Sequence, residues 1–249
     1  MLDLTRLIVY YFQPYPCISE RVELTLLFIH GAGGTPTVWH LQSLHFKDAT
    51  AVELPGHPTG SGLASIEQYA NFVKDYVTEN KLPEPVLVGH SMGGAIAIEY
   101  ALRYSTILGL VLVGTGARLR VRPEFLSELK ENYQEASKMV ASWSVSPGCD
   151  PVIVERIAKD LLKVKPEVTL GDFMACNNFD RMKDVDTITM RTLIICGADD
   201  KMTPVRYSQY LHEKIKGSKL VVIPNAGHAV MLERHRPFNQ ALEDFLDSL

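Results

Sequence analysis

The sequence has 249 residues, of which 46% are hydrophobic and 22% are charged, a composition typical of a soluble globular protein with one large core. Its formal net charge is −4, and its basic residues are dispersed apart from one run at residues 118–122. We therefore expect no nucleic-acid partner. The basic run is interpreted either as a solvated stretch or as a contact for an anionic substrate tail. No stretch approaches the length of a transmembrane helix, so no stable membrane anchor is expected.

The cysteines and the amino terminus favour a cytoplasmic location. Cys17, Cys149, Cys176 and Cys196 are far apart and form no Cys-x-x-Cys pair, which suits a reducing compartment. Residues 1–6 contain no basic region followed by an apolar core and a cleavage site, so no secretory signal is apparent.

Strands and helices alternate along the first half of the chain. Strands are predicted from apolar runs at residues 7–12, 24–29, 49–54, 85–88, 108–113, 192–196 and 220–223. Ser65 is the predicted N-cap of a helix in which apolar residues recur at helical spacing from Ile66 to Val77. This alternation predicts an α/β fold with a mostly parallel central sheet, of about eight strands, flanked by helices.

The pattern changes at residue 118. Between residues 118 and 189 no buried strand is predicted, and proline at or near the first turn opens three expected helices, at 123–140, 151–164 and 166–177. We interpret residues 118–189 as a helical cap inserted after the sixth strand, and residues 1–117 and 190–249 as the core domain. A further helix is expected to start at Thr203-Pro204, and a last one to span residues 237–249.

The most informative motif is Gly-His-Ser-Met-Gly-Gly at residues 89–94, between the strand at 85–88 and an Ala/Ile-rich helical segment. A Gly-x-Ser-x-Gly at such a junction is typical of a nucleophile elbow, a turn that strains the serine backbone and exposes its hydroxyl. We expect side chains at Gly89 or Gly93 to collide with the neighbouring strand or helix. Ser91 is therefore the candidate nucleophile.

A serine nucleophile needs a base, and the base needs an acid to orient it. In this architecture the chain order is serine, acid, histidine, which leaves His212, His228 and His235. The first and last of these fall in or at the start of predicted helices. His228 follows the last strand, at the sheet edge where Ser91 is expected, and is the predicted base.

The acid is expected in a loop at the same sheet edge. The loop after residue 113 contains no carboxylate, whereas the loop after residue 196 contains Asp199 and Asp200. The residues alone leave these two alternatives open, because one carboxylate can orient His228 while the other serves the turn or the following helix.

A glycine-rich loop, His-Gly-Ala-Gly-Gly, occupies residues 30–34 after a predicted strand. It lacks both the Lys-Ser/Thr ending of a P-loop and the Gly-x-Gly-x-x-Gly spacing of a dinucleotide site, so a nucleotide is disfavoured. His30 and His90 do not fit the required chain order and are interpreted as residues that shape loops. No pair of histidines or acids has a metal-binding spacing, and neither a metal nor another cofactor is expected.

Four motifs in this order resemble the α/β-hydrolase fold superfamily, and within it the capped, esterase-like serine hydrolases. They are the loop at 30–34, the elbow at 89–94, a Gly-x-x-Asp turn before Thr-Pro at 197–204, and Gly227-His228. The resemblance implies that Asp200 is the acid. It further implies that backbone N–H groups of Ala32 and Met92 form an oxyanion hole for the reacting carbonyl oxygen.

The resemblance implies a serine hydrolase that cleaves carboxylic esters of small to medium acyl chains through an acyl-enzyme. Alternatives within the fold are a thioesterase, lipase, acyltransferase or C–C hydrolase, and outside catalysis a ligand receptor with the same pocket. Several residues of the insertion are candidates either for an acyl pocket or for ordinary cap core. They are Met139, Trp143, Phe173, Met174 and Phe179.

Overall fold

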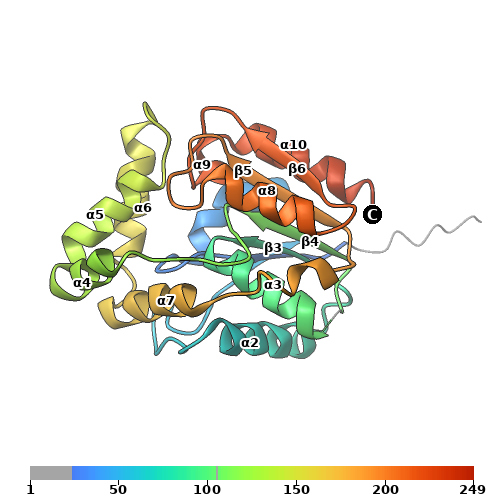
Figure 1. Cartoon of the computed structure of the whole chain (residues 1–249), viewed down its shortest axis with the longest axis horizontal. Coiled ribbons are helices and arrows are strands. Elements are labelled where there is room, and N and C mark those ends of the chain that lie inside the picture. Colours follow the sequence, from blue (N-terminus) through green and yellow to red (C-terminus); the bar gives the residue numbers. More distant parts are fainter. Residues whose placement is uncertain (1–23, 105) are drawn as a thin grey trace, which may run out of the picture.

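The computed structural model describes residues 24–104 and 106–249 (Figure 1). Its sheet has the strand order β2-β1-β3-β4-β5-β6, and every neighbouring pair is parallel. The strands are β1 (Leu26–Ile29), β2 (Ala49–Val52), β3 (Val86–His90), β4 (Gly109–Val113), β5 (Thr192–Gly197) and β6 (Lys219–Ile223). The α/β class and the parallel sheet follow the prediction.

Helices cover both faces of this sheet. Alternate strand residues point to opposite faces, so Leu27 and Leu87 pack in one core cluster while Phe28 and Val88 pack in another. The first face is covered by α2 (Ile66–Glu79), α3 (Met92–Tyr104) and α8 (Val205–Lys214). The second is covered by η1 (Pro36–Trp39), α1 (His40–His45), α9 (Val230–Glu233) and α10 (His235–Leu246). Burial on both faces explains why the inner strands are apolar runs without a polar alternation.

The expectation of about eight strands is wrong, since the described residues contain six. Each of the six coincides with a predicted apolar run. The seventh run, at residues 7–12, lies outside the described residues, as does Cys17. Residues 24–117 form four strands, which are the four apolar runs predicted there, and the other apolar residues of this range mostly lie on helix faces. The insertion therefore follows β4, the fourth strand of the described chain, and not the sixth.

The described chain between β4 and β5 contains helices and connecting loops but no strand. The helices are α4 (Pro123–Glu131), α5 (Tyr133–Trp143), α6 (Pro151–Leu161), α7 (Pro166–Asn178) and the short η2 (Val185–Thr187). The expected single helix at 123–140 is divided at Asn132, whose φ of −144° and ψ of 66° leave the helical region. An isolated antiparallel bridge joins Arg118 to Asp180, and the Arg181 N–H donates to the Ala117 carbonyl at 2.7 Å. The helical segment thus leaves and rejoins the core at neighbouring points.

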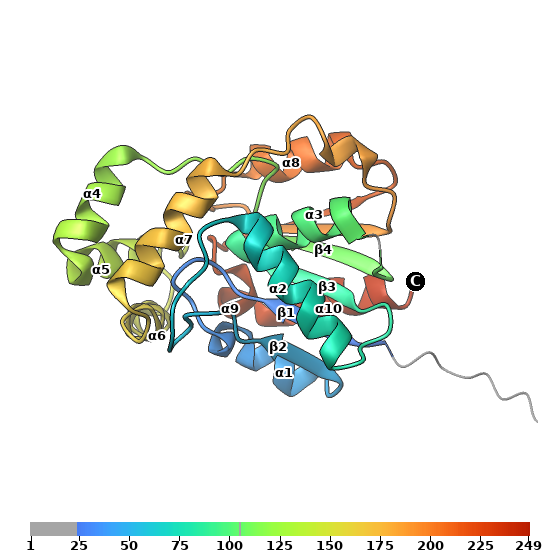
Figure 2. The ribbon, with the colours of Figure 1, turned by 90° about the horizontal axis from the view of Figure 1, so that it is seen from below.

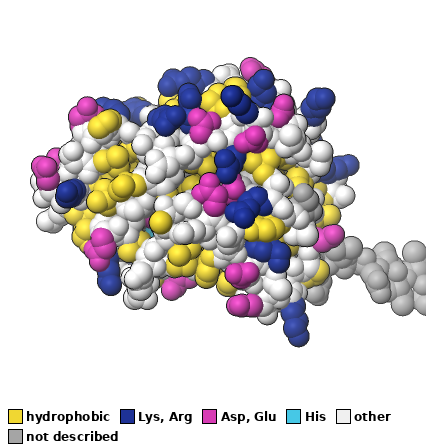
Figure 3. All heavy atoms as spheres, turned by 60° about the horizontal axis from the view of Figure 1, so that its bottom comes forward, with side chains coloured by type: hydrophobic (Ala, Val, Ile, Leu, Met, Phe, Trp, Pro, Cys, Tyr) yellow, Lys and Arg dark blue, Asp and Glu magenta, His cyan; other side chains and the backbone are white. Residues whose placement is uncertain are grey.

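The inserted helices α4–α6 lie at one end of the sheet in two perpendicular views (Figures 1 and 2). They share a small apolar cluster with α7 that includes Phe125, Leu129, Ala136 and Phe173. In the part of the chain that the structure describes, no helix combines the length and the apolar character needed to cross a bilayer. Figure 3 shows charges of both signs interspersed with hydrophobic side chains over the face in view.

Candidate active site

Ser91 lies between the end of β3 and the start of α3. Its φ of 54° falls in the left-handed region, which non-glycine residues seldom adopt. The Ser91 N–H donates to the Val113 carbonyl of β4 at 2.9 Å, and the Thr115 hydroxyl donates to the Ser91 carbonyl at 2.8 Å. Bonds on both sides of the residue hold the turn in this strained form.

The prediction that Gly89 and Gly93 leave no room for a side chain is confirmed. A Cβ on Gly89 would lie 2.2 Å from the Gly93 carbonyl oxygen, and one on Gly93 would lie 2.2 Å from the Ile29 carbonyl oxygen. Both obstacles are backbone atoms, which cannot rotate away as a side chain does. The glycines therefore let α3 start directly against β1 and β3.

The loops after β5 and β6 bring Asp200 and His228 together. His228 Nδ1 lies 2.8 Å from Asp200 Oδ2, and both side chains are buried. The N–H groups of Met202 and Thr203 donate to Asp200 Oδ1 at 2.9 and 2.8 Å, and the Thr203 hydroxyl donates to Oδ2 at 2.9 Å. This carboxylate is fixed by the turn that it begins.

Asp200 remains ionised in this setting. Burial opposes its charge, but the charge of His228 and hydrogen bonds from His228 and Thr203 outweigh burial and lower the pKa of Asp200 below its ordinary value. The residues alone left Asp199 and Asp200 as alternative acids, and of these two Asp200 contacts His228. His212, which also fits the expected chain order, contacts the Ser218 hydroxyl instead.

The loop after β1 faces the elbow. A Cβ on Gly31 would lie 3.2 Å from Ser91 Cβ, so this backbone approaches the serine closely. Within the described residues, neither the Ala32 N–H nor the Met92 N–H donates a hydrogen bond to the protein. Met92 begins α3, where the first N–H groups have no partner inside the helix. Both amides are therefore free to donate to a bound oxygen.

A cavity of about 130 Å³ joins these parts. Ser91, His228 and Ala32 line it from the core. The inserted helices contribute apolar walls, and the chief side chains are Val140, Ile157, Leu161 and Phe173. The cavity thus sets a serine hydroxyl and a carboxylate-bound imidazole beside an apolar space.

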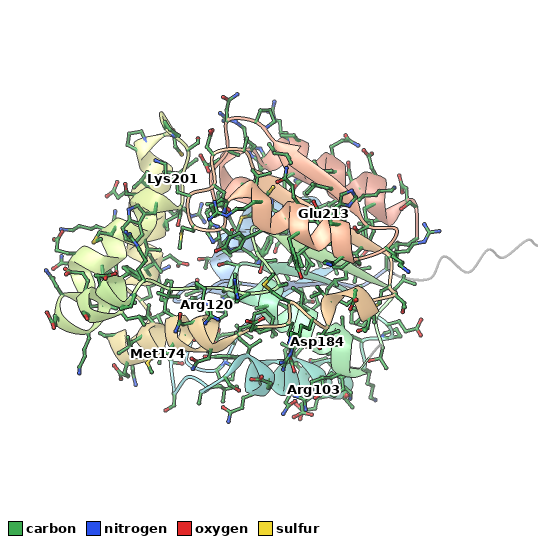
Figure 4. All side chains as sticks on the ribbon, viewed as in Figure 1. Arg103, Arg120, Met174, Asp184, Lys201 and Glu213 are labelled. Atoms are coloured by element: carbon green, nitrogen blue, oxygen red, sulfur yellow. The ribbon has the colours of Figure 1, made fainter. Side chains whose placement is uncertain are left out.

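Among the five candidate pocket residues of the insertion, Phe173 lines the cavity. Met174 lies on the outer side of α7 and is 50% exposed (Figure 4). The Trp143 ring packs on Phe125 at 5.2 Å between centroids, and Phe179 belongs to the core cluster beneath α2 and α3.

The basic run divides between the surface and the cavity. Arg118 and Arg120 both form ion pairs with Asp180, at 3.7 and 3.6 Å, and Arg122 lies over the Trp143 ring. Arg120, labelled in Figure 4, also contributes to the cavity wall.

His30 and His90 are buried and neutral near pH 7. Burial, reinforced by the charge of His57, lowers the pKa of His30 to about 4, and burial with the charge of His228 lowers that of His90 to about 3. His90 Nε2 contacts the His228 carbonyl at 3.1 Å, and His30 Nδ1 contacts the Gly31 carbonyl at 3.0 Å. Both contacts fit the predicted role in shaping loops.

Two buried carboxylates beside the site were missed from the sequence. Asp172 of α7 contacts Gly33, and Glu233 of α9 accepts the Gly227 N–H at 2.6 Å. No motif surrounds either acid, and both lie in segments that resemble ordinary helices. Within the described residues no cluster of three or more His, Cys, Asp or Glu has the arrangement of a metal site.

A family model described as the alpha/beta hydrolase family matches residues 26–241, which is most of the chain. The chain belongs to the alpha/beta hydrolase family. A solved thermophilic esterase is 36% identical to it in sequence and superposes with a TM-score of 0.80. The match covers 90% of this alpha/beta hydrolase and 89% of that chain.

Two curated relatives of this alpha/beta hydrolase are named as an ester hydrolase and a lactone hydrolase. A pimeloyl-[acyl-carrier protein] methyl ester esterase of Neisseria meningitidis serogroup B is 27% identical, covering 80% of this chain and 82% of the relative. The 3-oxoadipate enol-lactonase 2 of Acinetobacter baylyi is 26% identical, covering 92% and 91%. These names support a hydrolase with esterase-like relatives.

Proposed function

We propose that this alpha/beta hydrolase cleaves carboxylic esters of small to medium acyl chains, with Ser91, His228 and Asp200 as its catalytic triad. The observation that carries the proposal is the placement of strained Ser91 and of His228, already bonded to Asp200, on the wall of one cavity. Esterases among the relatives support the same reaction class.

In the proposed acylation, His228 Nε2 takes the hydroxyl proton of Ser91 while the Ser91 oxygen bonds to the ester carbonyl carbon. The carbonyl oxygen gains negative charge, and the N–H groups of Ala32 and Met92 donate to it. When the bond from the carbonyl carbon to the alcohol oxygen breaks, the departing alcohol receives the proton from His228. Asp200 holds the imidazole and stabilises its charged form.

In the proposed deacylation, His228 takes a proton from water as the water oxygen bonds to the acyl carbon. The second tetrahedral intermediate uses the same two N–H donors. It collapses by breaking the bond to Ser91, whose oxygen recovers the proton from His228, and the carboxylic acid leaves. The enzyme returns to its starting protonation state.

The cavity supports the proposed acyl size. Its volume of about 130 Å³ lies below the roughly 300–1,000 Å³ typical of pockets for drug-sized ligands. We further propose that residues 118–189 act as a cap over a core of residues 1–117 and 190–249, because α5, α6 and α7 supply much of the apolar wall.

The test is hydrolysis of p-nitrophenyl esters from acetate to palmitate by the natural protein, by Ser91→Ala and by Ser43→Ala. We expect turnover to peak at a short or medium chain and to fall by about 10³-fold or more in Ser91→Ala, since the acyl-enzyme cannot form. Ser43 is an exposed serine on α1, and its variant is expected to keep full activity.

Three outcomes contradict the proposal. Full activity in Ser91→Ala excludes the serine as nucleophile. A single stoichiometric burst without turnover in the natural protein favours the ligand receptor, and a peak at palmitate favours a lipase.

A further inference from the structure

The carboxylate of Asp172, on helix α7, is completely buried. It contacts the glycine-rich loop at residues 30–34, the oxyanion loop of the proposed function. Its Oδ2 accepts the Gly33 N–H at 2.9 Å and lies 2.7 Å from His57 Nε2. Its Oδ1 accepts the Tyr69 hydroxyl at 2.8 Å. The side chains of Asp172 and His57 are 0% exposed, as is Tyr69. Three elements of the core therefore converge on one carboxylate of the insertion.

The hydrogen-bond inventory fixes the protons of this cluster. His57 Nδ1 lies 3.0 Å from the Pro55 carbonyl, which can only accept, so Nδ1 carries a hydrogen. A second proton must lie between His57 Nε2 and Asp172 Oδ2, because two atoms without a proton would repel each other at this distance. The pair is thus neutral overall, which lowers the free-energy cost of burying it completely.

The oxyanion loop is fixed on both sides of Ala32. Before it, the Gly31 carbonyl accepts from His30 Nδ1 and from the Gly34 N–H, at 3.0 and 3.1 Å. After it, Gly33 has a φ of +62° and donates its N–H to Asp172. These contacts flank the Ala32 N–H, which has no hydrogen-bond partner among the described residues and belongs to a residue that lines the cavity.

Gly33 also fits closely against the insertion. A Cβ at this position would lie 2.8 Å from Thr169 Cγ2 and 3.1 Å from Leu161 Cδ2, side chains of α7 and α6. A second carboxylate of the insertion, Asp160, accepts the hydroxyls of Thr35 and Thr37 at 2.8 Å each. The loop is therefore shaped by the inserted helices as well as by the strand that precedes it.

We propose that Asp172 is a positioning residue, which holds the Gly33 amide so that the neighbouring Ala32 N–H points at the reacting oxygen. This inference rests on the proposed function. Asp172 is not among the residues that line the cavity, and in this proposal it acts through the backbone of the loop. A shift of helix α7 would therefore change the orientation of the Ala32 N–H relative to the reacting oxygen.

An amide cannot replace this carboxylate. With its NH2 group at the Oδ2 position, an asparagine would donate to a neutral His57 but would face the Gly33 N–H with a second donor. With its oxygen there, it would keep the Gly33 contact but would require a buried imidazolium that has lost its carboxylate. We expect the first arrangement, in which the loop loses its anchor while the volume of the side chain is kept. Complete loss of one oxyanion donor costs about 10²- to 10³-fold in rate, and a misplaced donor is expected to cost about 10-fold or more.

The experiment compares the natural protein with Asp172→Asn and Glu167→Gln, using a p-nitrophenyl ester and an alkylboronic acid that forms a tetrahedral adduct with serine. Asp172→Asn is expected to lower kcat by about 10-fold or more with KM little changed, and to weaken boronate inhibition by the same factor. Glu167 lies exposed on the same helix, and its variant is expected to change none of these quantities.

A merely structural role predicts a lower Tm with unchanged kcat and boronate affinity for the folded protein, and that result overturns the proposal. If Asp172→Asn does not fold, Tyr69→Phe decides. It removes the hydroxyl that donates to Oδ1 and accepts the Leu63 N–H, and it keeps both groups that bond to Oδ2. Parallel losses of kcat and boronate affinity support the proposal there, and a lowered Tm alone contradicts it. Ser91→Ala, measured alongside, separates the two hypotheses: if it keeps turnover the proposed function is wrong, and if it is inactive while Asp172→Asn is normal, only the positioning role is wrong.

Discussion

Glu233 joins the loop of His228 to the inserted segment. Its carboxylate accepts the Gly227 N–H at 2.6 Å, and it accepts the N–H and the hydroxyl of Ser146 at 2.8 and 2.6 Å. The Ala229 N–H donates to the Ser144 carbonyl beside this contact at 2.7 Å. The Glu233 side chain and this backbone bond together hold the His228 loop against the chain between α5 and α6.

Replacing Glu233 by Gln is expected to lower the free energy of unfolding by about 1–3 kcal/mol, because an amide end must face a buried donor that it cannot satisfy. Ester hydrolysis is expected to fall as well, since the His228 loop loses its anchor. Urea unfolding and p-nitrophenyl ester assays measure both effects. Glu213→Gln, on the exposed side of α8 (Figure 4), serves as the control. Equal stability of the two variants contradicts the expectation.

The two buried neutral histidines make stability depend on pH. The pKa values of about 4 for His30 and about 3 for His90 lie below the ordinary value of 6.5, so the unfolded chain binds more protons below pH 6.5. Stability is therefore highest above pH 6.5 and falls as the pH decreases toward these values. At pH 5 the expected loss is about 2 kcal/mol for each histidine. Urea unfolding at pH 7 and pH 5 measures it, and equal stability at both would refute the argument.

At the scale of the element, local signals succeeded where one short stretch decides the structure. Ser65 caps α2 as predicted: its hydroxyl accepts the Gln68 N–H at 3.3 Å, and Gln68 Oε1 accepts the Ala64 N–H at 2.8 Å. The division at Asn132 was missed because apolar residues on both sides continue at helical spacing. A break of one residue leaves that periodicity almost unchanged.

Substitution of this cap tests how much a local motif contributes. We expect Ser65→Ala to lower the free energy of unfolding by about 1 kcal/mol, because the Gln68 N–H loses its acceptor. Ester hydrolysis is expected to stay unchanged, because Ser65 is not among the residues that line the cavity and its hydroxyl bonds to the helix that it caps. Thermal unfolding of Ser65→Ala and Ser65→Thr provides the comparison, as threonine keeps the hydroxyl. A threonine variant as unstable as the alanine variant would show that the cap is not the cause.

At the scale of the whole molecule, the candidate site combines loops that leave the same edge of one parallel sheet. The loops after β1, β3, β5 and β6 carry Ala32, Ser91, Asp200 and His228. Their order was predictable because each motif directly follows an apolar run. Asp172 was not predictable, since its three partners lie more than a hundred residues away and an acid on a helix is usually solvated.

The short antiparallel bridge between Arg118 and Asp180 has a consequence for how this protein can change over evolutionary time. Since the inserted helices leave and rejoin the core side by side, replacement of the whole segment between Arg118 and Asp180 need not alter the spacing of β4 and β5. The loops that carry Ser91, Asp200 and His228 stay in place during such an exchange, whereas the apolar walls are replaced together. The proposed positioning role of Asp172 requires a new segment to supply a carboxylate in the same place, so not every graft that folds is expected to be active.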